Sequence, residues 1–219
     1  ICLSSVPIIT MNPDLIIFPE TALPSYLRIE NRVRKRLQQK VNESGIPIII
    51  GTVDRHIDSN RTKSYFNSSM YLSPQADYLM YDKIHLVPFA EYDLIPSFLS
   101  PLANLNLNMN RGIFKKGNNY ANFRVNNLVF SDIICYESSF PRYARKFVGN
   151  GADFLIIQAN DGWLGTSAGP FQHFAQAKLR AIENRTPIAR GGNTGISGFI
   201  LPTGEVMTKT LLGKQVIIK

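Results

Sequence analysis

Long hydrophobic runs are missing from this chain of 219 residues. No segment reaches the roughly 18 to 20 consecutive apolar residues that span a bilayer. The first residues, Ile-Cys-Leu-Ser-Ser-Val-Pro, also lack the charged and long apolar regions of a signal peptide. We therefore expect the chain as given to be soluble, without a transmembrane helix of its own.

Cysteine is scarce, since only Cys2 and Cys135 are present. This number excludes a multi-disulfide framework, and one bridge between the extreme N-terminus and a buried strand end would be geometrically unusual. His, Cys and carboxylates at metal-ligand spacing are absent too, and the run Gly191–Gly195 lacks the arrangement of a phosphate-binding loop. The sequence therefore predicts no metal and no nucleotide cofactor.

Acidic residues are outnumbered, because 16 Asp and Glu stand against 24 Lys and Arg and the formal net charge is +8. A positive surface favours anionic partners such as nucleic acid, phospholipid head groups or acidic substrates, without choosing among them. The one basic cluster, Arg32–Arg36, lies in an expected helix and no aromatic-interleaved basic motif follows it. A solvated helix face explains this cluster better, so we expect no nucleic-acid partner.

The apolar content of 44% is ordinary and suits a single domain over residues 1–219. Short apolar runs bounded by Gly, Pro and Asn predict buried strands at 15–18, 46–51, 68–72, 128–134 and 154–157, with a strand-like run at 216–218. Helical spacing covers a stretch that ends at Ser44, then 140–149 and 171–184. The last helix carries an apolar stripe of Phe171, Phe174, Ala175, Leu179 and Ile182. Alternating strands and helices indicate an α/β fold.

Three polar residues next to these runs are candidates for chemistry. Cys135 follows the run 128–134 at a polar turn, where N–H groups at a helix start can lower a thiol pKa from about 8.5 and bind an oxyanion. Glu20 follows the run 15–18, at the strand end where α/β active sites gather, and Lys83 lies in an apolar setting. Each keeps a simpler alternative: an inert buried cysteine, a glutamate at a helix start and a solvated lysine.

Together, in order and spacing, these residues resemble the Glu, Lys and Cys motifs of the nitrilase, or carbon-nitrogen hydrolase, superfamily. The segments that carry the resemblance are FPETA at 18–22, YDKIHLVPFAEY at 81–92 and ICYE at 134–137. Within the superfamily the sequence is most similar to the apolipoprotein N-acyltransferase family, through HLVPFAEY, NDGW at 160–163 and GPFQH at 169–173. The likeness extends from about Asp14 to about Val206.

This resemblance implies a nitrilase-type αββα sandwich in which Cys135 attacks the acyl ester of a phospholipid. Glu20 would be the general base, and Lys83 would stabilise the tetrahedral intermediate. The thioester on Cys135 would pass its acyl group to the α-amino group of a diacylglyceryl-cysteine at the N-terminus of an apolipoprotein. An acyl-enzyme divides one hard transfer into two easier steps, and no cofactor is required.

The resemblance also implies a set of residues that support the site or bind substrate. These are Asn67, Glu91, Tyr136, Glu137 and Trp163. For Glu91 and Glu137 the alternatives of a loop salt bridge and a helix N-terminal charge remain open. Trp163 and His173 are interpreted as scaffold that shapes the pocket floor, since buried tryptophan is more often core than catalytic.

The family further implies a membrane setting. The acyl donor would be a phospholipid such as phosphatidylethanolamine, the acceptor a diacylglyceryl apolipoprotein, and the catalytic domain would face the periplasm at the bacterial inner membrane. Family members carry transmembrane helices around this domain, and its first strand is not found upstream of Leu15, so we expect a fragment of a longer membrane protein. The apolar arm Leu94–Leu107 suits contact with lipid or acyl chains.

Two other functions fit parts of the same pattern. A soluble amidase of the superfamily would share the three catalytic residues and finish with water instead of an amine. A binding domain that has kept the fold but lost activity predicts that one of these residues is missing, and none is.

Overall fold

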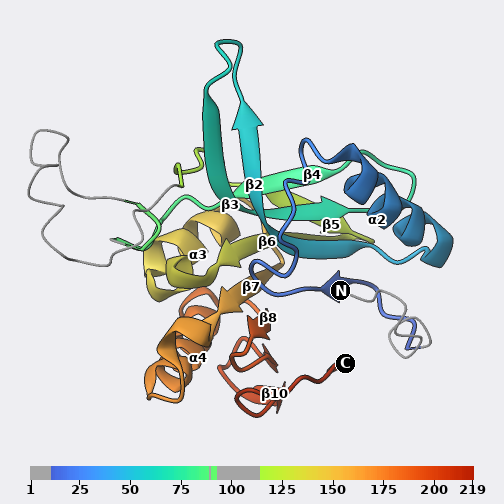
Figure 1. Cartoon of the computed structure of the whole chain (residues 1–219). Coiled ribbons are helices and arrows are strands. Elements are labelled where there is room, and N and C mark those ends of the chain that lie inside the picture. Colours follow the sequence, from blue (N-terminus) through green and yellow to red (C-terminus); the bar gives the residue numbers. More distant parts are fainter. Residues whose placement is uncertain (1–10, 89, 93–113) are drawn as a thin grey trace, which may run out of the picture.

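The computed structural model describes residues 11–88, 90–92 and 114–219, whose strands form two sheets (Figure 1). The first sheet has the order β1-β2-β3-β4. Its strands are β1 (Ile16–Ile17), β2 (Ile48–Ile57), β3 (Lys63–Leu72) and β4 (Leu79–Asp82). β1 runs parallel to β2, and the other neighbours are antiparallel. β2 and β3 form a long hairpin that projects at the top of Figure 1.

The second sheet has the order β10-β9-β8-β7-β6-β5. Its strands are β5 (Asn122–Val125), β6 (Leu128–Ile134), β7 (Phe154–Asn160), β8 (Ile188–Asn193), β9 (Gly198–Ile200) and β10 (Val206–Lys209). β6, β7 and β8 run parallel to one another. The residues that follow these three strands therefore meet at one edge of the sheet, which is where α/β folds place their active sites.

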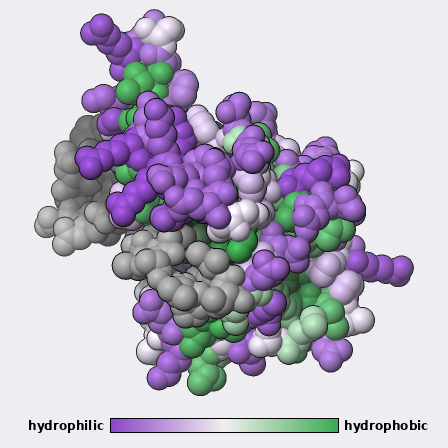
Figure 2. All heavy atoms as spheres, turned by 90° about the vertical axis from the view of Figure 1, so that its right-hand side faces the viewer, coloured by the Kyte–Doolittle hydropathy of each residue, from purple (hydrophilic) through white to green (hydrophobic). Residues whose placement is uncertain are grey.

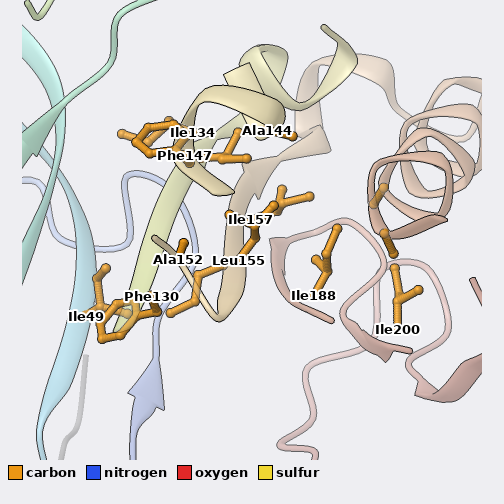
Figure 3. Packing of buried hydrophobic residues seen from close by; sticks show 14 of the residues in the cluster. Ile49, Phe130, Ile134, Ala144, Phe147, Ala152, Leu155, Ile157, Ile188 and Ile200 are labelled. Carbon is orange, nitrogen blue, oxygen red and sulfur yellow. The ribbon is translucent and has the colours of Figure 1, made fainter. Parts of the chain in front are cut away.

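Helices cover the outer faces of both sheets. α2 (Asn31–Ser44) buries Leu37 and Val41 against Ile48 and Ile50 of β2. α3 (Pro141–Gly149) and α4 (Gly169–Asn184) pack on the second sheet within the larger apolar cluster. Ile49, which lies between the two β2 residues that face α2, points the other way and belongs to the cluster with Phe130 of β6 (Figure 3). This alternation places helix, sheet, sheet and helix in successive layers, so the expected αββα sandwich is confirmed.

β6 matches its predicted range, and β1, α3 and α4 begin and end within two residues of theirs. β2 and β3 are longer than predicted, and β4, β5, β8, β9 and β10 were not predicted. The prediction of a strand at 216–218 is wrong. Val216 and Ile217 are 56% and 50% exposed, and no partner strand pairs with them in the part of the chain that the structure describes. Two predictions concern residues that the structure does not describe. The missing first strand was sought upstream of Leu15, where residues 1–10 are not described, and the arm Leu94–Leu107 lies within residues 93–113.

The apolar stripe expected on α4 is also largely wrong. Phe171, Leu179 and Ile182 are 54%, 49% and 47% exposed, and among the stripe only Phe174 is buried. The face that packs inward includes His173 and Arg180. Polar side chains can occupy this face because they bond to groups at the turn after β6, a contact that hydropathy periodicity does not register.

None of the helices in the described part of the chain has the length and apolar character needed to cross a membrane. The face seen in Figure 2 is mostly hydrophilic, and hydrophobic residues occur on it as separate groups.

Candidate active site

Cys135 lies at the turn where β6 ends and the short 3-10 helix η3 (Cys135–Ser139) begins. Its φ of 49° is in the left-handed region, which a residue with a side chain adopts only where the surrounding structure holds it. The side chain is half-buried. A strained turn from strand to helix presents such a side chain beyond the edge of the sheet, as nucleophiles on α/β folds are presented.

A lysine and two carboxylates lie together in a buried cluster. Lys83 Nζ is 3.3 Å from Glu20 Oε1 and 3.0 Å from Glu91 Oε1. Asn67 Nδ2 donates to the same two oxygens at 2.7 Å each. Glu20 is 4% exposed and Lys83 is 1% exposed, so neither charge is solvated and each depends on its partner. The structure thus brings together four residues singled out in the sequence.

These residues come from neighbouring elements of the first sheet. Glu20 follows β1, Asn67 lies in β3, and Lys83 directly follows β4. The Lys83 N–H donates to the Asn67 carbonyl at 2.8 Å, which fixes the start of the lysine segment. A Cβ on Gly51 of β2 would stand 2.6 Å from Glu20 Cα. Only glycine allows the Glu20 turn to lie this close to the strand.

The electrostatics of the cluster keep the lysine charged and the thiol protonated. Burial lowers the pKa of Lys83, but the negative charges of the neighbouring carboxylates, chiefly that of Glu20, outweigh burial and raise this pKa overall. Burial and the carboxylate of Glu20 raise the pKa of Cys135 to about 12, although Lys83 opposes the change. Burial is the largest of these effects, so the lowering that N–H groups at a helix start can produce does not prevail for this thiol. At neutral pH the thiol therefore needs a base.

Glu137 connects the cysteine turn to the lysine segment. Its side chain is fully buried and pairs with donors from both segments. These donors are the N–H groups of Ile134 at 2.8 Å, Ile84 at 2.7 Å and His85 at 2.9 Å, and the Tyr81 hydroxyl at 2.8 Å. The carboxylate is therefore more than a charge at a helix start, since it bonds the segment that follows β4 of the first sheet to the end of β6 in the second sheet.

Two aromatic residues of the expected site lie on its outside. Tyr136 is half-buried and its ring stacks on His85 with centroids 5.5 Å apart. Trp163 is 80% exposed, so the interpretation of this residue as buried pocket floor is wrong. It belongs to the 3-10 helix η4 (Asp161–Leu164), in which Asp161 points inward and Trp163 lies on the solvent side.

A second buried network lies behind Cys135. Asp161 accepts a hydrogen bond from Arg190 Nη2 at 2.8 Å and contacts His173 Nδ1 at 2.7 Å. His173 was expected as scaffold and is 8% exposed, whereas Asp161 and Arg190 were not predicted as site residues. The sequence position of Asp161 could have indicated a site residue. Asp161 directly follows β7, which runs parallel to β6, the strand that Cys135 follows.

The arrangement offers an ammonium group in contact with two carboxylates, and a thiol whose pKa is influenced by Glu20 and Lys83. Groups of these types are suited to acyl transfer through a covalent intermediate. No group of three or more His, Cys, Asp or Glu residues could hold a metal ion in the described ranges.

Comparison with known proteins places the chain in a family. The carbon-nitrogen hydrolase family matches residues 8–218. Curated apolipoprotein N-acyltransferases from Geobacter metallireducens and Allorhizobium ampelinum are 34% and 38% identical to the chain over 206 and 207 residues. The alignments cover 94% and 93% of this chain, but the chain spans only 39% of the length of each relative.

Solved structures agree on the fold. A carbon-nitrogen hydrolase from Helicobacter pylori G27 has a TM-score of 0.72 at 14% identity, with 97% of this chain and 77% of that chain covered. An amidase from Nesterenkonia sp. has a TM-score of 0.65 at 16% identity, with 93% and 75% covered. Identities this low show the fold alone, whereas the family match and the named relatives also support an enzyme. The chain belongs to the carbon-nitrogen hydrolase family and is similar, over nearly all of its length, to the apolipoprotein N-acyltransferases.

Proposed function

We propose that the chain is the catalytic domain of an apolipoprotein N-acyltransferase, with Cys135 as nucleophile, Glu20 as general base and Lys83 as the cation that stabilises the oxyanion. The observation that carries the proposal is the buried contact of Lys83 Nζ with Glu20 Oε1 at 3.3 Å, beside a thiol whose pKa both groups influence. Sequence identity of 34% and 38% to curated enzymes of that name supports transfer of an acyl group as the reaction.

The first half-reaction forms a thioester. Because the pKa of Cys135 is about 12, the thiol proton must leave as the sulfur attacks, and the Glu20 carboxylate accepts it. Sγ bonds to the ester carbonyl carbon of a phospholipid, and Lys83 faces the oxyanion that develops. The raised pKa of Lys83 keeps this cation present throughout. When the carbon–oxygen bond breaks, the departing lysophospholipid alkoxide takes the proton from Glu20.

The second half-reaction forms an amide. The α-amino group of a diacylglyceryl-cysteine attacks the thioester carbonyl, and Glu20 accepts a proton from the attacking nitrogen. The tetrahedral intermediate again faces Lys83. The carbon–sulfur bond then breaks, and the sulfur of Cys135 recovers a proton from Glu20. The products are an N-acylated peptide and the free enzyme, with no change of oxidation state and no cofactor.

We assign supporting roles to the neighbouring residues. Asn67 and Glu91 hold Glu20 and Lys83 in contact, since Asn67 Nδ2 and Lys83 Nζ both bond to Glu91 Oε1. Glu137 fixes the cysteine turn against the lysine segment. We assign Tyr136, whose ring stacks on His85, to substrate contact.

The setting of the reaction is part of the proposal. Residues 1–219 would form one catalytic domain of a longer membrane protein, on the periplasmic side of the bacterial inner membrane. The donor would be a phospholipid such as phosphatidylethanolamine, and the acceptor a diacylglyceryl apolipoprotein. The net charge of +8 favours approach to anionic lipid head groups. We assign the exposed Trp163 a role in contact with acyl chains, since it does not form the pocket floor.

A second candidate is an amidase that hydrolyses a small amide, because the solved structures with this fold include an amidase from Nesterenkonia sp.. The same thiol, carboxylate and lysine would serve, with water in place of the amine. The fold does not separate the two reactions, whereas the sequence identity favours the acyltransferase.

A product assay on the full-length protein in detergent separates them. The substrates are phosphatidylethanolamine and a diacylglyceryl-cysteinyl peptide, and the peptide is analysed by mass spectrometry. We expect the peptide to gain one acyl group in a bond that resists hydroxylamine, and Glu20→Gln and Lys83→Met to abolish this gain. Lys40→Met, at an exposed ion pair with Glu43, is the matched control. Ammonia release from a small amide without acylated peptide would replace the proposal with the amidase reaction.

A further inference from the structure

Three side chains from three different elements join in a line behind Cys135. Asp161 Oδ1 lies 2.7 Å from His173 Nδ1, and His173 Nε2 lies 2.9 Å from Ser138 Oγ. Ser138 Oγ in turn donates to the carbonyl oxygen of Cys135 at 2.7 Å. η4 supplies the aspartate, α4 the histidine and η3 the serine, so the line connects two strand ends of the second sheet through the helix that covers it.

The distances match those of a Ser-His-Asp nucleophilic triad, but the burial excludes that role. Ser138 is fully buried, and its hydroxyl hydrogen is directed to a backbone carbonyl. A nucleophile must reach the substrate and give its proton to the histidine. This serine does neither, so the three residues must act through the backbone that they contact.

The contact is made at the strained residue itself. The carbonyl of Cys135 lies 2.7 Å from Ser138 Oγ and 3.2 Å from His173 Nε2. A carbonyl oxygen can only accept hydrogen bonds, so the Ser138 hydroxyl donates to it, and His173 Nε2 donates to it when that nitrogen carries a proton. Cys135, whose φ is 49°, therefore has two side chains in contact with its own carbonyl oxygen. Backbone conformations of this kind persist only where the surroundings over-determine them.

The Asp161 end of the line is also held by buried contacts. Arg190 Nη2 donates to Asp161 Oδ2 at 2.8 Å, and Arg190 and Asp161 are 3% and 2% exposed. A Cβ on Gly195 would collide with that same carboxylate oxygen, so glycine leaves room for the aspartate. Arg180 Nη1 separately holds the end of η3 through the Ser139 carbonyl at 3.0 Å.

We infer that Asp161, His173 and Ser138 form a positioning relay that holds the Cys135 carbonyl and thereby fixes the direction in which Sγ meets the acyl donor. The inference rests on the proposed function, because it assigns Cys135 as the nucleophile. The relay residues touch neither substrate nor the reacting atoms. They set the geometry of attack, and misplacement of a reacting atom by about 1 Å can slow a reaction about 100-fold.

The test compares two neighbouring serines in the full-length protein. Ser138→Ala removes the hydrogen bond to the Cys135 carbonyl. Ser139→Ala removes a hydrogen bond between the same short helix and α4, at Gln176 Oε1, but leaves that carbonyl untouched. We expect Ser138→Ala to slow single-turnover acylation of Cys135 by phosphatidylethanolamine about 10- to 100-fold with the KM for donor unchanged, and Ser139→Ala to stay within about twofold.

Two substitutions at His173 add a geometric control. The side-chain nitrogen of His173→Gln can occupy the place of Nε2 and still donate to the carbonyl, whereas His173→Asn can reach only Asp161. We expect His173→Gln to acylate faster than His173→Asn, with both compared at equal folded fraction from melting curves. Equal rates, or rates that follow the melting temperature alone, would show a merely structural role and overturn the inference.

Alkylation by iodoacetamide gives a readout that needs no acyl donor. A released turn exposes the thiol, so Ser138→Ala should alkylate faster than Ser139→Ala at equal folded fraction. If the wild-type protein forms no phospholipid adduct, the proposed function fails while alkylation still decides the relay. If the adduct forms at the same rate in both serine variants and alkylation rates are also equal, the relay fails and the proposed function stands.

Discussion

Replacing Lys83 by methionine tests whether the buried cluster holds the site together. The substitution keeps the volume of the stem but leaves Glu20 and Glu91 buried without their cation. Removing one partner of a buried ion pair costs about 3 to 5 kcal/mol, because the remaining charge is uncompensated. For a chain of this size 1 kcal/mol corresponds to about 2 to 4 °C, so we expect the melting temperature to fall by about 6 to 20 °C.

The assay is thermal unfolding of the purified full-length protein at pH 7. Lys40→Met is the matched control, because Lys40 and Glu43 form an exposed pair at 2.8 Å and their loss should leave the melting temperature unchanged. Adding Glu20→Gln to Lys83→Met removes one unpaired charge while keeping an oxygen for Asn67, and should recover part of the loss. A Lys83→Met protein that melts within 2 °C of the control would refute the reasoning.

The raised pKa of Lys83 determines how its contribution to stability changes with pH. The folded pKa of Lys83 is raised above its ordinary value of 10.5. The stability that this lysine contributes is therefore fully present below pH 10.5 and is lost as the pH rises through the folded pKa. The difference in melting temperature between wild type and Lys83→Met should stay constant from pH 7 to pH 9.

Further predictions concern the thiol, the relay and the exposed tryptophan. Alkylation of Cys135 by iodoacetamide should be slower at pH 8 than that of a free cysteine peptide and should keep rising beyond pH 10, because burial raises the pKa to about 12; a plateau near pH 9 would contradict this. Burial raises the pKa of Asp161, but hydrogen bonding to His173 and the charge of Arg190 outweigh it and lower this pKa below 3.8. The stability lost in Asp161→Asn should therefore persist from pH 8 down to pH 4, in melting curves, and a loss that vanishes near pH 6 would argue against the ion pair. Trp163→Ala should leave the melting temperature unchanged, since the side chain is 80% exposed, and a large drop would show that it packs after all.

The sequence was informative where local pattern and fold agree. An apolar run that ends at a polar segment predicted β6 and the turn at Cys135. Glu20 was predicted as a site residue in the same way, because it comes after the apolar run 15–18. The contact of Lys83 with Glu20 joins residues far apart along the chain, so only the motif resemblance could associate them before the structure did, whereas Glu91 lies in the same segment as Lys83.

Three of the errors concern which groups are buried. On α4 the inward face carries His173 and Arg180, whose polar groups bond to the turn after β6, so hydropathy alone selects a more exposed face. Trp163 was interpreted as buried scaffold of the pocket floor, but η4 directs its aspartate inward instead. Burial is the largest effect on the pKa of Cys135 and raises it, and burial cannot be read from sequence spacing.

Intact-mass spectrometry of the full-length protein in detergent, after mixing with phosphatidylethanolamine, tests the central claim most directly. The account predicts an adduct of one acyl group that hydroxylamine removes and that Cys135→Ala abolishes, since a thioester is labile to that nucleophile. An adduct that persists in Cys135→Ala would contradict the assignment of the nucleophile. Absence of any adduct with phospholipid, together with an adduct from a small amide, would contradict the acyltransferase and support the amidase.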